Sequence, residues 1–320
     1  MRILVTGASG FVGSLIVPRL LSEGHQVRAL ARDPDRARGR IQPGTELIRG
    51  DALTGEGLRQ ALEGVEVAYY LIHSMERSAV DSGRFQERER TAAETFASAA
   101  ASSGVRRIVY LGGLLPHSGE RPTVEPTDGY SQLSRHLASR EEVEQILLAG
   151  VADSVALRAS IVIGARSRSF RLLVHLVERL RVLALPAWRR FRTQPIDARD
   201  IAEMLTASAT AAVGGRSLDV GGPDVLSYGE MIERIAELML VNRLSLGLGV
   251  SMTAVTARVA AAIAGEDPEL VLPLMESLQG DLLPADDHAA ELLGVGLHSF
   301  DSAVEHALSE WEESEPLAAR

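Results

Sequence analysis

Cysteine is absent from this chain of 320 residues, and aromatic residues make up only 4% of it. The absence of cysteine excludes disulfides, cysteine nucleophiles and thiolate metal sites. It suits a reducing compartment, so we expect a cytoplasmic location. Long apolar runs are also missing: the longest charge-free stretch, Leu244 to Ala257, has 14 residues and is too short to span a bilayer. We therefore expect a soluble protein with no membrane span and, because the first apolar run already begins at Ile3, no leader segment.

The chain has fewer basic than acidic residues, 33 against 43, which gives a net charge of −10. This balance disfavours general binding to nucleic acid, so the expected partner is a small molecule. No spacing among the histidines indicates a metal site. The composition, 46% hydrophobic and 24% charged, is otherwise that of an ordinary globular protein, and it leaves oligomerisation open.

The first 33 residues carry the clearest pattern. A short apolar run at 3–6 predicts a buried strand, a glycine-rich turn follows at 7–13, and a helical pattern leads to a second strand at 26–30. A glycine turn between a strand and a helix is typical of a dinucleotide site, because backbone amides and the helix N-terminus can approach a pyrophosphate. The predicted contacts are Thr6, Gly7, Ser9, Gly10, Phe11, Val12 and Gly13.

The end of the second strand bears on the choice of cofactor. A carboxylate that binds the ribose is expected there, about 20 residues after the glycines. The chain instead has Arg32, which suits a 2′-phosphate and favours NADP, while Asp33 could still reach a ribose, so NAD is the alternative. Further predicted cofactor contacts lie just after the next strand, at Asp51 and Ala52, and at the end of the strand after that, at Leu71 and Ile72. Asp51 has a second interpretation, as the N-cap of a helix that begins at Leu53.

Strands and helices alternate through the first half of the chain. Further strands are predicted at 46–49, 65–72, 107–111 and 155–163, with helices over 85–102 and 131–149. This alternation predicts an α/β fold, a Rossmann doubly wound parallel sheet.

The remaining residues predict how the chain is divided. Residues 1–163 form the expected core, completed by 196–220, where a helix capped by Asp197 or Asp200 precedes a last strand. Residues 164–195 and 221–315, helical from Ser227 to Trp311, are left for a smaller, mostly helical C-terminal lobe, and 316–320 for a frayed tail. The arginine-rich segment 166–192 could bind an anionic ligand, contact an acidic partner or form a solvated helical face.

Several stretches together resemble an extended or atypical short-chain dehydrogenase/reductase: TGASGFVG at 6–13, GD at 50–51, VRRIVY at 105–110, LRA at 157–159 and VGGP at 220–223. YLIHSM at 70–75 and TQPI at 193–196 make the chain most similar to the NAD(P)H-binding atypical group, which includes NmrA-like proteins and relatives of a complex I accessory subunit. The resemblance implies a Rossmann fold, a nicotinamide cofactor and oxidoreductase or isomerase chemistry.

The catalytic motif departs from the enzymes that the chain resembles. They place a serine after the fifth strand and Tyr-x-x-x-Lys on the next helix. Here the serine position reads Gly112-Gly113, and the helix offers His136 and Arg140 at the same spacing, on one helical face. Arg140 can hold a ribose but stays charged, whereas an imidazole with a pKa of about 6.5 suits an acid/base role. His136 could equally be a polar residue at the cofactor's edge, and His73, beyond a strand end, is a second candidate for catalysis.

Two kinds of function remain open from the sequence. The first is an NADP-dependent oxidoreductase acting on a small carbonyl-type or planar substrate. The second is a non-enzymatic NADP(H)-binding protein, either a sensor or a structural or assembly subunit, because the serine, tyrosine and lysine are missing together.

Overall fold

The structure, a computed structural model, describes residues 1–72, 82–115, 135–180, 182–185, 187–247 and 280–314. At its centre lies a parallel sheet of seven strands in the order β11-β6-β5-β4-β1-β2-β3. The strands are β1 (Arg2–Thr6), β2 (Gln26–Ala31), β3 (Glu46–Arg49), β4 (Val67–Tyr70), β5 (Arg107–Gly113), β6 (Val155–Ala159) and β11 (Arg216–Val220). This order and direction confirm the predicted Rossmann sheet.

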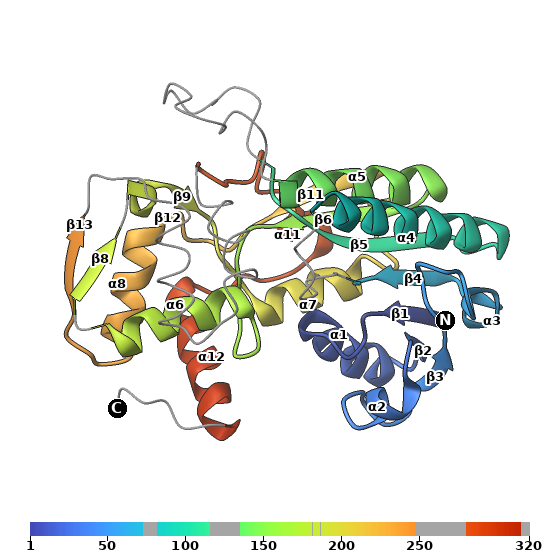
Figure 1. Ribbon diagram of the computed structural model, residues 1–320, viewed down its shortest axis with the longest axis horizontal. Coiled ribbons are helices and arrows are strands. Elements are labelled where there is room, and N and C mark those ends of the chain that lie inside the picture. The colour runs from blue at the N-terminus through green and yellow to red at the C-terminus, as the bar shows by residue number, and fades with distance from the viewer. Residues whose placement is uncertain (73–81, 116–134, 181, 186, 248–279, 315–320) are drawn as a thin grey trace.

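Helices cover both faces of the sheet (Figure 1). One face packs against α1 (Phe11–Ser22) and α7 (Ala198–Ala207), with α11 (Ala289–Leu293) beside them. The other face packs against α3 (Leu58–Leu62), α4 (Ser82–Ser102) and α5 (Arg135–Gly150). The short helix α2 (Pro34–Arg38) joins β2 to β3. Because side chains alternate along each strand, Val5 lies in the first layer and Leu4 in the second.

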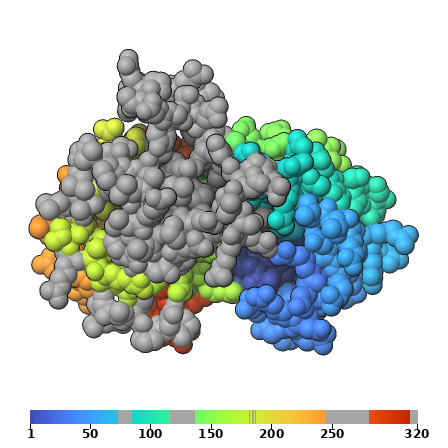
Figure 2. Space-filling model, viewed as in Figure 1, coloured from blue at the N-terminus to red at the C-terminus, as the bar shows by residue number. Residues whose placement is uncertain are grey.

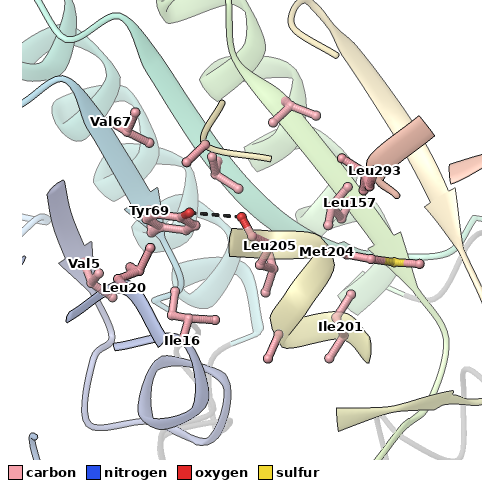
Figure 3. Close-up of a cluster of buried hydrophobic side chains, with 14 of the residues drawn as sticks. Val5, Ile16, Leu20, Val67, Tyr69, Leu157, Ile201, Met204, Leu205 and Leu293 are labelled. Carbon is pink, nitrogen blue, oxygen red and sulfur yellow. Dashed lines mark hydrogen bonds between the residues drawn. The ribbon is translucent and has the colours of Figure 1, made fainter. Parts of the chain in front are cut away.

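A hydrogen bond inside the first apolar layer ties α7 to the sheet. The Tyr69 hydroxyl, fully buried on β4, donates to the carbonyl of Leu205 at 2.9 Å (Figure 3). At the amino end of β5, buried Arg107 donates to the carbonyls of Ser208 and Ala211, both at 2.7 Å. The carbonyl of Leu205 is one of the last four of α7, which have no partner within the helix, whereas Ser208 and Ala211 belong to the turn after it.

The C-terminal half builds a second apolar cluster from α6 (Arg168–Arg179), α8 (Tyr228–Leu238) and α12 (Phe300–Ser314). Small strand pairs accompany it: β7 (Val162–Ile163) with β10 (Ile196–Asp197), β9 (Arg192–Thr193) with β12 (Leu226–Ser227), and β8 (Val182–Leu185) with β13 (Leu244–Gly247). A 3₁₀ turn, η1 (Ala187–Arg190), precedes β9. In Figure 2 the green-yellow and orange atoms of this half lie to one side of the blue N-terminal residues. No helix in the described ranges is long and apolar enough to cross a membrane.

Two predicted elements were wrong in extent. The strand expected over 155–163 ends at Ala159, because the chain then leaves the sheet: the Ser160 hydroxyl donates to the carbonyl of Gln194, and β7 pairs with β10 instead. The helix expected from Ser227 onward is interrupted by β13, a parallel partner of β8. The predicted N-cap at Asp197 is confirmed, since its carboxylate accepts from the backbone of Arg199 at 2.6 Å. The division into a core and a lobe at the stated residues stays a prediction.

A buried ion pair fastens α5 to the sheet. Glu144 is 1% exposed, and its carboxylate accepts both from the guanidinium of Arg158 on β6, at 3.0 Å from Nε to each oxygen, and from the hydroxyl of Ser217 on β11. Asp219 lies 3.7 Å from the same guanidinium. These hydrogen bonds raise the pKa of Arg158. Every charge in the group is partnered, as low-dielectric burial requires.

We predict that Glu144→Leu destabilises the fold by about 3 kcal/mol, because it leaves Arg158 without its principal partner. Chemical denaturation would measure the change in unfolding free energy. The matched control is Glu142→Leu on the same helix, whose carboxylate is exposed and 4.0 Å from Arg90, and which should cost less than about 1 kcal/mol. Equal costs for the two variants would contradict the assignment of Glu144 as a structural anchor.

Candidate functional site at the carboxyl edge of the sheet

The glycine turn is held by contacts that leave no space for side chains. Gly7 has a φ of +71°, and a Cβ there would lie 2.5 Å from the carbonyl oxygen of Leu71. A Cβ on Gly13 would lie 2.6 Å from the Cα of Ala8, so α1 packs directly on the turn. The sequence interpretation of these two glycines, a tight turn and close helix packing, is confirmed.

The outer side of the same turn is open. Gly10, the N-cap of α1, is exposed and in extended conformation, and its amide donates to the carbonyl of Gly7 at 2.9 Å. The helical hydrogen bonds begin with Ser14 N to the Gly10 carbonyl, so the amides of Phe11, Val12 and Gly13 precede the ladder. Ser9, Phe11 and Val12 are partly exposed. Free amides and a bare backbone are the donor set that a pyrophosphate requires.

Thr6 has a structural use that the sequence did not indicate. Its hydroxyl is fully buried, donates to the carbonyl of Tyr69 at 2.9 Å and accepts from the amide of Leu71 at 3.2 Å. The side chain therefore joins β1 to the end of β4. A contact of Thr6 with a cofactor would have to come from its backbone.

Two arginines meet where β2 and β3 end. Arg32 follows β2 directly and is exposed, and its carbonyl accepts from the guanidinium of Arg49, the last residue of β3, at 3.2 Å. Asp33 is used as the N-cap of α2, accepting from the amide of Arg36 at 3.1 Å. Sequence reasoning missed Arg49, whose position at this corner depends on the pairing of the two strands. The corner thus presents cations where a ribose-binding carboxylate is usual.

Asp51 closes a turn next to this corner. Its carboxylate accepts from the amide of Leu53 at 2.8 Å, but no helix begins there, because α3 starts at Leu58. The N-cap interpretation was therefore right about the acceptor and wrong about the helix. Ala52 beside it is buried.

The end of β4 lies against the glycine turn. Leu71 and Ile72 are partly buried, and the backbone of Leu71 lies against Gly7. His73 lies outside the described residues, and so does the side chain of His136, although its backbone belongs to α5.

Arg140 lies at the carboxyl end of β5. Its Nη2 donates to the carbonyl of Leu111 at 3.1 Å, and its Cδ approaches Gly113, where a Cβ would lie 3.6 Å away. Its Nε is buried and has no hydrogen-bond partner in the described part of the chain. This buried guanidinium N–H could donate a hydrogen bond to a ribose or phosphate oxygen.

The described tyrosines nearest this position do not replace a catalytic tyrosine. The Tyr110 hydroxyl lies 3.5 Å from the backbone carbonyl of Arg140, and burial raises its pKa despite the neighbouring guanidinium. Burial likewise raises the pKa of Tyr70. Such hydroxyls stay protonated, so they cannot act as bases near neutral pH.

The chain contains no lysine, so all 33 basic residues are arginine. The missing lysine of the catalytic motif therefore has no substitute elsewhere in the chain. Arginine keeps its charge at every physiological pH and can bind anions but not exchange protons. The absence of lysine is visible in the sequence itself. It is a further difference from the catalytic motif of the active enzymes.

Strand order, glycine turn and open helix N-terminus define a dinucleotide-binding Rossmann protein. The family described as NAD(P)H-binding matches residues 7–172, more than half of the chain. The chain therefore belongs to this NAD(P)H-binding family, within the atypical group of short-chain dehydrogenase/reductases that its motifs indicate.

Curated relatives are similar over part of their length. The 3 beta-hydroxysteroid dehydrogenase/Delta 5-->4-isomerase of Mycobacterium tuberculosis is 30% identical over 145 residues, 41% of this chain and 38% of that protein. A 4-hydroxy-2-methyl-3-oxo-4-farnesyl-3,4-dihydroquinoline-1-oxide ketoreductase of Stigmatella aurantiaca is 24% identical over 67% of this chain and 66% of its own. The chain thus spans about two fifths of the first relative's length and just under two thirds of the second's.

The fold is shared over the whole chain. The enzyme WbmH of Bordetella bronchiseptica, solved in complex with NAD+, has a TM-score of 0.69 at 17% identity and covers 98% of this chain and 99% of its own. This likeness extends to the C-terminal half, which the family match does not include.

Substitutions at Gly10 and at Gly13 can separate an effect on ligand access from an effect on folding. We predict that Gly10→Val abolishes dinucleotide binding while the melting temperature falls far less than in Gly13→Val, because Gly10 is exposed, has an ordinary φ of −75°, and would bring its Cβ only to 3.1 Å from the carbonyl oxygen of Gly7. Calorimetric titration and a thermal melt would measure both.

The matched variant is Gly13→Val, in which the side chain meets the backbone of Ala8 and should lower the melting temperature strongly. Normal binding by Gly10→Val would show that the ligand does not approach this turn.

Proposed function

We propose that this chain binds NADP(H) along the carboxyl edge of its sheet and acts as an oxidoreductase on a small carbonyl-type or planar substrate. The observation that carries the proposal is the bare glycine turn beside the open N-terminus of α1, together with arginine rather than a carboxylate after β2. The residues present fit a dinucleotide. The backbone amides of the glycine turn, the two arginines where β2 and β3 end, and the buried Nε of Arg140 all lie at the carboxyl edge of the sheet.

Each predicted residue has a place in this proposal. Gly7, Ser9, Gly10 and the amides of 11–13 would hold the pyrophosphate, with Thr6 contributing its backbone. Asp51 and Ala52 would meet the adenine side. Leu71 and Ile72 would border the crevice from β4.

The cationic corner supports NADP over NAD. A 2′-phosphate placed beside Arg32 would also be within the field of Arg49, whose guanidinium already reaches the Arg32 backbone. Asp33, the acid that directly follows Arg32, has its carboxylate engaged by the amide of Arg36. Charge-assisted contacts of this kind are stronger than neutral ones.

We predict that NADPH binds more tightly than NADH and that Arg32→Ala reduces the difference by roughly tenfold or more. Arg49→Ala should reduce it less, because its guanidinium reaches the corner from the neighbouring strand. Parallel calorimetric titrations of both nucleotides would measure the ratio. Arg59→Ala, which removes an exposed charge from α3, is the control. Equal affinities in the unmodified protein would refute the NADP preference.

Catalysis would use the residues of α5. A bound nicotinamide supplies hydride chemistry at its C4. Arg140 would hold the ribose or a phosphate through the donors that Leu111 does not occupy, and His136, with His73 or water as alternatives, would move the proton at the substrate oxygen. The two relatives described above are a dehydrogenase and a ketoreductase, which supports this type of chemistry for the present chain.

One observation favours a second function, a non-enzymatic NADP(H)-binding sensor or structural protein. The serine position is Gly112-Gly113, and without lysine the chain cannot form Tyr-x-x-x-Lys anywhere. A Cβ at Gly112 would lie 3.1 Å from the ring of Tyr110, so the strand end is packed too tightly for a serine to replace the glycine without a shift.

We predict that His136→Ala lowers turnover by roughly 10²- to 10⁴-fold with cofactor affinity nearly unchanged, because a general acid/base contributes on that scale. Arg140→Ala should instead weaken the cofactor. Nicotinamide absorbance, followed with a panel of small carbonyl compounds and quinones, would report turnover. The rate should also depend on pH through one ionisation in the range of imidazole.

Unchanged turnover in His136→Ala would assign the proton to His73 or water. Tight NADPH binding without turnover of any substrate in the panel would support the sensor.

A further inference from the structure

Arg166 is an exposed residue between two buried ones. Ala165 and Ser167 on either side are only 4% and 6% exposed. A turn fixes the backbone here, with the amide of Ser167 donating to the carbonyl of Gly164 at 2.9 Å, and the Ser167 hydroxyl then caps α6. The direction in which Arg166 leaves the chain is therefore set by the fold.

This turn lies against the start of α1. A Cβ on Gly164 would lie 2.8 Å from the ring of Phe11, so the segment can pass there only as glycine. The guanidinium of Arg166 donates to the hydroxyl of Ser14 at 2.9 Å, and that hydroxyl donates to the carbonyl of Phe11 at 2.7 Å. Arg166 thus reaches the first turn of the glycine-loop helix from a segment 152 residues away in sequence.

The charge at this point is unbalanced. A helix N-terminus carries partial positive charge and favours anions, yet α1 has no acidic residue in its first turn and receives an arginine instead. In the described part of the chain, Ser14 is the hydrogen-bond partner of the Arg166 side chain, and no carboxylate forms an ion pair with it. Four of its five N–H donors remain available there.

We propose that Arg166 is a cofactor-binding residue that contacts the pyrophosphate of the dinucleotide from the side opposite the glycine turn. The inference rests on the proposed binding of a dinucleotide at that turn. An anion between the first turn of α1 and the guanidinium would be held by free backbone amides on one side and by charge-assisted bonds on the other. The Ser14 hydroxyl keeps the guanidinium at this position before the ligand arrives, which lowers the entropy cost of binding.

The test compares ligands that share the pyrophosphate with one that lacks it. Arg166→Gln should weaken NADPH, NADH and ADP-ribose by the same factor, roughly 10- to 100-fold, and leave 2′-AMP unaffected. Arg216→Gln removes an equally exposed charge at the amino end of β11 and should change none of these affinities. A thermal melt should be unaltered by Arg166→Gln, because the side chain is exposed.

The alternative outcomes are distinct. Loss of affinity for NADPH alone would move the contact to the 2′-phosphate and overturn the proposal, and equal binding by Arg166→Gln and the unmodified protein would show that the arginine is only solvated. Failure of the unmodified protein to bind any dinucleotide would instead overturn the proposed function and, with it, this inference.

Discussion

The site depends on backbone packed directly against backbone at the glycine turn. Gly7 touches the end of β4, and Gly13 presses α1 onto the turn, so neither position accepts even one methyl group. The buried Thr6 hydroxyl, bonded to the Tyr69 carbonyl and the Leu71 amide on either side of Tyr70, ties β1 to the end of β4. Because these contacts define where the helix begins, they also define where its free amides point. Gly10, between these two packed glycines, is exposed.

Around this turn the chain distributes fixed positive charge. Arginines lie where β2 and β3 end, at the end of β5 and in the turn before α6. Because the chain has no lysine, no lysine amine is present to exchange a proton at any of these places. Such a site is built to hold an anionic ligand over a wide range of pH. Since arginine does not transfer protons, an enzyme would need another group for this step. The histidines are the candidates, so their role separates the enzyme from the sensor.

The sequence predicted the fold where local pattern decides the structure. The strands predicted at 3–6 and 26–30, and the turn that follows the first of them, come from apolar runs and from the spacing of the glycines, and the structure has β1 and β2 there. The strand over 155–163 was predicted too long, because the apolar pattern continues past the residue at which Ser160 bonds to Gln194. β13 was missed because its local composition is typical of a helix, whereas its pairing with β8 is a contact between segments far apart in the sequence.

The candidate site was predictable to a similar degree. Glycine positions and Arg32 could be read from spacing, whereas Arg49, the engaged carboxylate of Asp33 and the leftover Nε of Arg140 depend on how neighbouring elements meet. Arg166 fell within a segment rich in arginine, where charge alone could not separate a ligand contact from a solvated face. Its position beside the first turn of α1 is shown by one hydrogen bond, to a residue 152 positions away in the sequence.

The position of α7 and β11 bears on how the protein is made. Both lie beyond residue 172, where the family match ends, yet α7 covers α1 and receives the Tyr69 hydroxyl, and β11 shields the edge of β6. A nascent chain that has emerged only to residue 172 therefore exposes apolar surface of α1 and an unpaired strand edge. Such surfaces invite aggregation and chaperone binding. The residues of the candidate site, all at or before Arg166, are therefore synthesised before the elements that cover α1 and the edge of β6.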